Sequence, residues 1–122
     1  MSIPNKTYEM YRGDFLALGI YVTYADGDPV DLTGWTAKFI GKLNLTDADV
    51  DAVLNLDGFI GIQTNPVEKG RTRVIIHNAD TLALPTSITR INYMWQLTDT
   101  LSNVHTLEKG ILRVLPDITI ST

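Results

Sequence analysis

Length, composition and charge already exclude several classes of protein. The chain has 122 residues and no cysteine, and its ten Lys and Arg against fourteen Asp and Glu give a formal net charge of −4. A chain of this length forms one domain that buries about two-thirds of the surface that its unfolded chain exposes. The absence of cysteine excludes disulfides and cysteine nucleophiles. The basic residues are scattered along the sequence, which argues against nucleic-acid binding.

The first predicted element is a long strand over residues 15–24. In the stretch FLALGIYVTY every second residue from Leu16 to Tyr24 is apolar, and the alternate positions hold a smaller or more mixed set that includes Gly19 and Tyr21. This period of two predicts a strand with one face in the core and a second face that is partly covered. Tyr21 lies on the second face and is a candidate contact to a neighbouring subunit.

The tripeptide Arg12-Gly13-Asp14 directly precedes this strand. Animal adhesion receptors recognise the same three residues, but a motif of three residues is weak. Glycine permits a backbone bend, and aspartate accepts a hydrogen bond from a turn. We therefore interpret the tripeptide as the turn that starts the strand.

Two stretches that interrupt the later strands carry helix signals. Residues 45–58 (LTDADVDAVLNLDG) place Val50, Val53 and Leu54 at helical spacing after Thr46, a suitable N-cap, and so predict one short amphipathic helix. Farther along, residues 77–85 can hold a single helical turn capped by Asn78.

The aspartates Asp47, Asp49 and Asp51 of the first stretch also have the spacing that opens a calcium loop. The sixth position of that motif is Ala52 instead of glycine, and the twelfth is Gly58 instead of a bidentate glutamate. We therefore favour a capped, solvated helix start and expect no metal and no cofactor.

Four further segments show the alternation of strands. They are residues 35–43, 71–78, 91–99 and 105–115, and in the last of them the apolar phase shifts around Gly110, as a β-bulge would cause. Together with the first strand and the turn residues about every ten positions, they predict an all-β sandwich over residues 1–122.

The aromatic and titratable residues of these strands suggest no chemistry. Trp35 and Trp95 fall on the apolar phase, which favours the core over a sugar-binding surface. His77 and His105, the two histidines, lie in different predicted strands, and the sequence contains no phosphate loop, metalloprotease helix or nucleophile elbow. We expect no enzymatic activity and no small-molecule ligand.

The motifs also follow one another in a characteristic order. Gly13-Asp14 precedes the first strand, DGDPVDLTG follows it, a short turn ends in Leu-Pro, and the chain closes with a W-x-L-x-D strand and a G-x-L-x-V strand that ends in Asp-x-Thr. This order, over most of the chain, resembles the N-terminal domain of bacteriophage baseplate upper proteins and related small tail-associated proteins. The resemblance implies an immunoglobulin-like antiparallel β-sandwich that acts as an assembly module.

From this resemblance we expect a virion structural protein of the phage tail or baseplate, assembled in the bacterial host cytoplasm. Its partners would be other virion proteins and copies of itself, in an oligomer. No segment resembles a secretion signal or approaches the roughly 20 apolar residues of a membrane helix, so we expect no membrane insertion. Two alternatives stay open, namely a capsid decoration protein and, as a weaker one, a carbohydrate-binding module.

Strand edges and the second face of the first strand are candidate contacts, because an unpaired edge is a template for another chain. The acidic segment 47–68, which lacks any Lys or Arg, is another. Its aspartates Asp47, Asp49, Asp51 and Asp57 could face a basic partner. The alternative interpretation is a solvated loop, and both stay open.

Changing Asp47, Asp49 and Asp51 to Asn distinguishes the two interpretations. If a basic partner binds this segment, the loss of three negative charges weakens assembly at low salt, where screening is least. Sedimentation of assembly mixtures at low and high salt measures the effect. Assembly that does not change at low salt would leave the solvated loop as the explanation.

Overall fold

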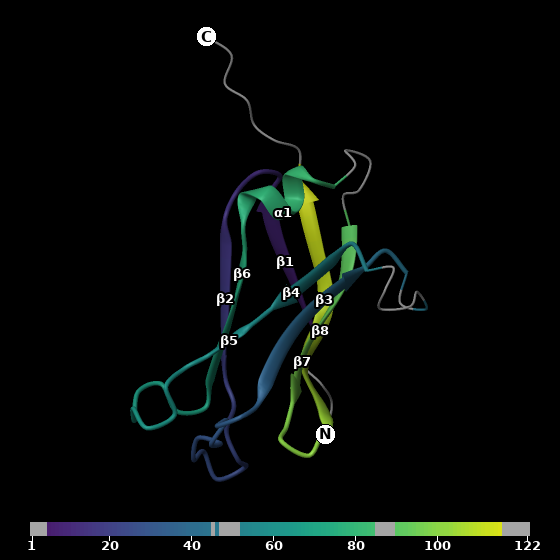
Figure 1. Cartoon of the computed structure of the whole chain (residues 1–122). Coiled ribbons are helices and arrows are strands. Elements are labelled where there is room, and N and C mark those ends of the chain that lie inside the picture. The colour runs from purple at the N-terminus through teal and green to yellow at the C-terminus, as the bar shows by residue number, and fades with distance from the viewer. Residues whose placement is uncertain (1–4, 45, 47–51, 85–89, 116–122) are drawn as a thin grey trace.

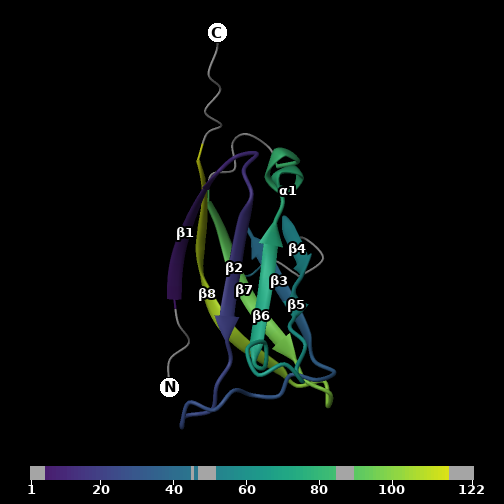
Figure 2. The same ribbon diagram turned by 90° about the vertical axis from the view of Figure 1, so that its left-hand side faces the viewer.

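A computed structural model describes residues 5–44, 46, 52–84 and 90–115. These residues form two β-sheets packed face to face, and one short helix lies at one end of them (Figures 1 and 2). The larger sheet has the strand order β1 (Asn5–Tyr11), β8 (Val104–Leu115), β7 (Arg90–Thr98), β3 (Thr36–Lys42) and β4 (Leu54–Asp57). The smaller sheet has the order β2 (Leu16–Tyr21), β6 (Arg71–Ile76) and β5 (Phe59–Ile60), and the helix is α1 (Asn78–Leu82).

The predicted all-β sandwich is confirmed, and six of its strands follow the order of strands B to G in immunoglobulin domains. In those domains strand E lies between B and D, and strand F lies between C and G. Here β6 lies between β2 and β5, and β7 lies between β3 and β8. The first strand differs, because β1 pairs in parallel with β8 of the larger sheet instead of lying beside β2, so the sandwich is not wholly antiparallel.

The core is centred on β7, where the sequence prediction is most accurate. The inward residues Ile91, Tyr93, Trp95 and Leu97 are completely buried. Phe39 of β3 stacks on Tyr93 with ring centroids 5.1 Å apart and meets Trp95 edge-on at 6.2 Å. Such pairs contribute about 0.5–1.5 kcal/mol each beyond their buried area.

The helix predicted over residues 45–58 is wrong at its C-terminal end. Leu54–Asp57 is strand β4, which pairs antiparallel with β3 so that Leu54 lies opposite Gly41. The alternation of Leu and polar residues in LNLD suits an edge strand with Leu54 buried, and pairing with β3 outweighs the local helical spacing. Residues 47–51 of this prediction lie outside the described part of the chain.

The short helix is the second predicted one. Its N-cap is His77 and not the predicted Asn78, which is the first helical residue. The His77 backbone N–H donates to Asp80 Oδ2 at 2.8 Å, and Asn78 Oδ1 accepts from Ala79 N–H. At the other end, Arg12 Nη1 donates to the carbonyl oxygens of Thr81 (2.8 Å) and Leu84 (2.7 Å). Arg12 thus fastens the turn before β2 to the end of α1 and the residue that follows its C-cap, in agreement with a structural role for the tripeptide.

The bulge in the last strand exists, but it lies before Gly110. Trp95 pairs with Glu108 and Gln96 pairs with Thr106, so Leu107 is the extra residue of β8. Gly110 has a different role: a Cβ there would overlap the carbonyl oxygen of Lys6 in β1. Glycine therefore lets β1 approach β8 closely.

Candidate interaction surface

The structure describes two of the five predicted contact residues and places them in different sheets. Tyr21 ends β2 of the smaller sheet, and Asp57 ends β4 at the edge of the larger sheet. Asp47, Asp49 and Asp51 lie outside the described residues. Tyr21 and Asp57 therefore do not form one site.

The two described acidic residues of segment 47–68 are paired within the chain. Lys38 Nζ lies 2.7 Å from Asp57 Oδ1, in a pair that is largely exposed. Glu68 Oε1 lies 2.9 Å from Arg73 Nη2 and 3.8 Å from Arg71 Nη1. Ion pairs near the surface contribute at most about 1 kcal/mol to the stability of the fold. They nevertheless offset negative charge that a basic partner would otherwise meet. A contact through Asp57 stays a prediction.

The outward side of the smaller sheet is unusually apolar. We call it the outer face; the cross-strand register and the exposure of its side chains define it as Ala17, Gly19, Tyr21, Phe59, Arg71, Arg73 and Ile75. Tyr21 is 54% exposed and Phe59 is 56% exposed. The solvent face of an antiparallel sheet normally carries polar residues. The second face of β2 is therefore open to solvent, where the sequence predicted partial cover.

Tyr21 is held in place on this face. Its hydroxyl donates a hydrogen bond to the Val67 carbonyl at 2.9 Å, and the Arg71 guanidinium carbon lies 5.3 Å from the ring centroid. Glu68 in turn fixes Arg71 and Arg73. An aromatic side chain that is already ordered loses little conformational entropy when a partner covers it.

A buried carboxylate lies between β1, β7 and β8. Glu108 is only 2% exposed, and its Oε1 accepts hydrogen bonds from the hydroxyls of Tyr8 (2.7 Å) and Tyr93 (2.8 Å). Lys6 Nζ lies 3.7 Å from Glu108 Oε2. Burial, followed by the hydrogen bond to Glu108, raises the pKa of both tyrosines above the usual range. We call this set the Glu108 cluster; it fastens β1 to the sheet.

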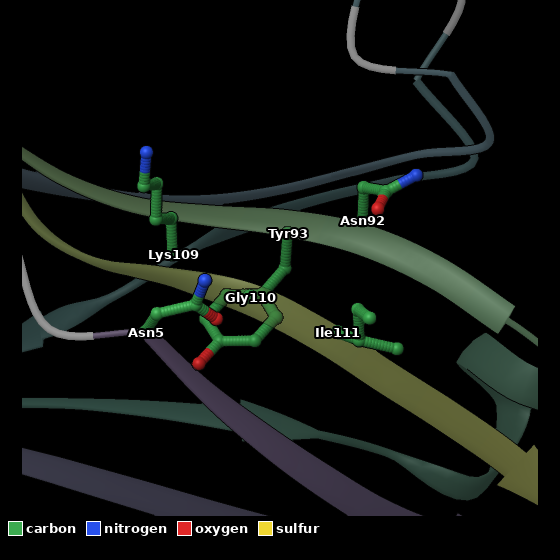
Figure 3. A pocket seen from close by; sticks show the side chains of 6 residues that line it. All are labelled: Asn5, Asn92, Tyr93, Lys109, Gly110 and Ile111. Atoms are coloured by element: carbon green, nitrogen blue, oxygen red, sulfur yellow. The ribbon is translucent and has the colours of Figure 1, made fainter.

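Beside this cluster lies a hollow of about 170 Å³ over Gly110. Figure 3 shows Asn5 and Lys109 on one side of it and Asn92 on the other, while the Tyr93 ring passes β8 toward β1. Pockets that enclose small molecules are usually about 300–1,000 Å³. A second hollow of about 350 Å³, lined by residues 32–35 and 60–64, contains no titratable side chain. Neither hollow brings together groups for acid–base chemistry.

The second histidine belongs to the hairpin that joins β7 and β8. His105 Nε2 lies 3.0 Å from Asp99 Oδ2, and the Asp99 carboxylate also accepts from the backbone N–H groups of Leu101 and Asn103. The hydrogen bond with His105 is the largest cause that lowers the pKa of Asp99 to about 2. The His105 ring stacks on Trp35 at 5.4 Å. Asp99 and His105 thus hold the β7–β8 turn, and the His105 ring covers one face of Trp35.

The described residues show neither a cation site nor a membrane span. Within residues 5–44, 46, 52–84 and 90–115, no three His, Asp or Glu side chains lie close enough to hold a metal ion. No helix of the same residues is long and apolar enough to cross a membrane.

Sequence reasoning identified Tyr21 but missed Phe59 and the Glu108 cluster. Phe59 lies in a strand of two residues, too short to show alternation. Glu108 did leave a signal, because it occupies an inward position in phase with Leu112 and Val114. A charged residue on the apolar phase of a strand indicates a buried partner.

The sequence matches no known protein-family model, and a search of characterised proteins finds no similar sequence.

Changing Tyr8 to Phe tests the Glu108 cluster. The variant loses one hydrogen bond to a buried carboxylate, so its free energy of unfolding should fall by about 1.5–3 kcal/mol. Tyr11→Phe, at an exposed position of the same strand, is the matched control and should change stability by less than about 0.5 kcal/mol. Urea denaturation measures both, and equal effects would contradict a special role for Tyr8.

The raised pKa values of Tyr8 and Tyr93 predict a loss of stability at alkaline pH. Tyrosines of the unfolded chain lose their protons near pH 10, whereas these two keep theirs in the folded protein. Above about pH 10 the folded state therefore binds more protons, and stability falls as pH rises. Urea denaturation from about pH 8 to 11 should show this fall, and a less steep one in Tyr8→Phe. Identical slopes would contradict the prediction.

Proposed function

We propose that this protein is a structural protein of a bacteriophage virion, an assembly module of the tail or baseplate that acts through protein–protein contacts. The observation that carries the proposal is the outer face, where Tyr21 and Phe59 are each more than half exposed on a sheet face that has no cover among the described residues. Exposed apolar surface of this kind is typical of interaction sites.

A few side chains of the outer face can supply most of the binding energy of a contact. Interfaces take most of their binding energy from a handful of side chains near the centre, often aromatic residues or arginine. The outer face offers Tyr21 and Phe59 together with Arg71 and Arg73. Two arginines fixed by Glu68 can stay paired when water is excluded, which limits the cost of desolvation.

The resemblance to baseplate upper proteins supports the place of this module in a virion. Two of the motifs of that resemblance lie in turns and strands of the sandwich: Gly13-Asp14 lies in the turn before β2, and the W-x-L-x-D motif spans the end of β7. Glu108, Asp99 and Arg12 are engaged in holding the fold.

Changing Phe59 to Ser tests the outer face. Phe59 is exposed, so the fold should persist, while incorporation of the protein into particles should fall at least about tenfold, which corresponds to about 1.4 kcal/mol. Leu101→Ser is the matched control, because Leu101 is 80% exposed in the β7–β8 turn, outside the outer face. Quantitative immunoblots of purified particles measure incorporation. Equal incorporation of both variants would contradict a contact through Phe59.

Immunogold electron microscopy of the same particles tests the location. Gold at the tail or its tip is expected. Gold spread over the head would indicate a decoration protein and overturn the tail assignment, and particles without gold would overturn the virion assignment itself. Glycan binding by the isolated protein would favour a carbohydrate-binding module instead.

A further inference from the structure

Strand β2 is an open edge of the smaller sheet. Its described strand neighbour is β6. The first strand of an immunoglobulin domain usually lies beside the second, but here β1 pairs instead with β8 along its whole length. Figure 2 shows β1 in the layer of the larger sheet, with β2 and β6 in the other layer. The side of β2 that faces away from β6 therefore has no strand beside it among the described residues.

The backbone groups on this edge come from Ala17, Gly19 and Tyr21. Val22 N–H donates to the Gly70 carbonyl at 2.7 Å, on the side of β6. Because successive residues of a strand point their N–H and C=O groups to opposite sides, Leu16, Leu18 and Ile20 also face β6. Ala17, Gly19 and Tyr21 consequently present their donors and acceptors outward.

The side chains under this edge are incompletely covered. Val74 and Ile76 on β6 are completely buried, whereas Leu16, Leu18 and Ile20, which point into the same core, are only partly buried. A further strand beside β2 would complete their cover. Burial of apolar surface contributes roughly 25 cal/mol per Å², so these side chains favour such a neighbour.

The edge also lacks the features that usually prevent pairing. Natural edge strands are protected by charges, proline or short length. The other edges have these features: β1 carries Lys6 and Glu9, β4 has four residues and ends in Asp57, and β5 has two residues. The residues of β2, LALGIY, include neither a charge nor a proline.

We propose that β2 pairs antiparallel with β2 of a second copy of this chain, about a two-fold axis that passes through Gly19. The pairing rests on the proposed function and names one of its partners. Gly19 lies opposite Gly19 of the second copy, and Ala17 lies opposite its Tyr21. Each pair exchanges two hydrogen bonds, and the two smaller sheets join into one.

The sequence of β2 is complementary to itself in this register. In a register centred on Gly19, the outward N–H and C=O groups of Ala17 meet those of Tyr21 of the second copy, as in any antiparallel pair. The small Ala17 leaves room on the outer face for the ring of Tyr21 of the second copy. A closed two-fold contact of this type uses the same surface on both subunits, which an unrelated partner would not match residue by residue.

Charges permit the pairing. Arg73 lies opposite Gly19 within the chain, so the two Arg73 residues of the dimer are separated by three strand spacings, about 14 Å. This separation exceeds the screening length of about 8 Å at physiological salt. Within each copy, Glu68 Oε1 also lies 2.9 Å from Arg73 Nη2 and offsets its charge. The outer faces of both copies remain available for another virion protein.

Charged substitutions at Gly19 test the register. A Cβ at Gly19 meets no atom closer than 3.7 Å, so the monomer has room for a side chain. In the proposed dimer, Gly19→Lys places two like-charged side chains on residues that face each other, with Cα atoms about 5.5 Å apart. Sedimentation and light scattering should give twice the 13.5 kDa of one chain for the unchanged protein and for Gly19→Ser, and 13.5 kDa for Gly19→Lys and Gly19→Glu.

Mixing the Lys and Glu variants completes the test. If Gly19 meets its own copy, the mixture recovers a dimer that contains one of each, because opposite charges are now paired. Circular dichroism shows whether each variant is folded. A monomeric unchanged protein, or a dimer that persists in both charged variants, would overturn the proposal.

The result of the dimer test can be distinguished from the result of the test of the proposed function. A monomeric protein that nevertheless labels the phage tail would overturn the β2 pairing and leave the assembly role in place. A β2 dimer that is absent from particles would leave the β2 pairing in place and overturn the proposed role in the virion.

Discussion

The hydrogen bonds that two tyrosines donate to the buried carboxylate of Glu108 are the interaction on which the arrangement of this protein depends. Tyr8 lies on β1, Tyr93 on β7 and Glu108 on β8, so one carboxylate joins three strands. A buried carboxylate is costly unless hydrogen bonds replace its hydration, and here two phenols do so. The first strand is thereby fixed in the larger sheet, and Gly110 provides the space that its close approach requires.

The position of β1 determines which surfaces remain open. Because β1 lies beside β8, β2 becomes the edge of the smaller sheet, and Leu16, Leu18 and Ile20 stay partly exposed. The outer face continues from that edge and exposes Tyr21 and Phe59. An edge strand with free backbone groups and an apolar sheet face are the two surfaces through which a β-sandwich binds other proteins most readily. Both support the proposed role in assembly, and the open edge is a consequence of where the first strand is placed.

Four polar side chains of types common in active sites are engaged in structure. Arg12 donates to the carbonyls at the end of α1, His105 and Asp99 hold the β7–β8 turn, and Glu108 holds β1. Each of these contacts satisfies a group that a helix end, a turn or the core would otherwise leave unpaired. The shifted pKa values of Tyr8, Tyr93 and Asp99 therefore describe stability, as structural networks also perturb titration.

The sequence by itself determined the fold class and much of the core. Alternation in residues 91–97 identified four inward residues correctly, because burial on one face of a strand imposes a period of two, and Tyr21 was placed correctly on the outward side of β2. Only the tertiary structure decided that Leu54–Asp57 is a strand, that β1 belongs to the larger sheet, and that Phe59 joins Tyr21 on one face. These features depend on pairing between segments far apart in the chain, and local patterns of spacing contain no information on which strands become neighbours.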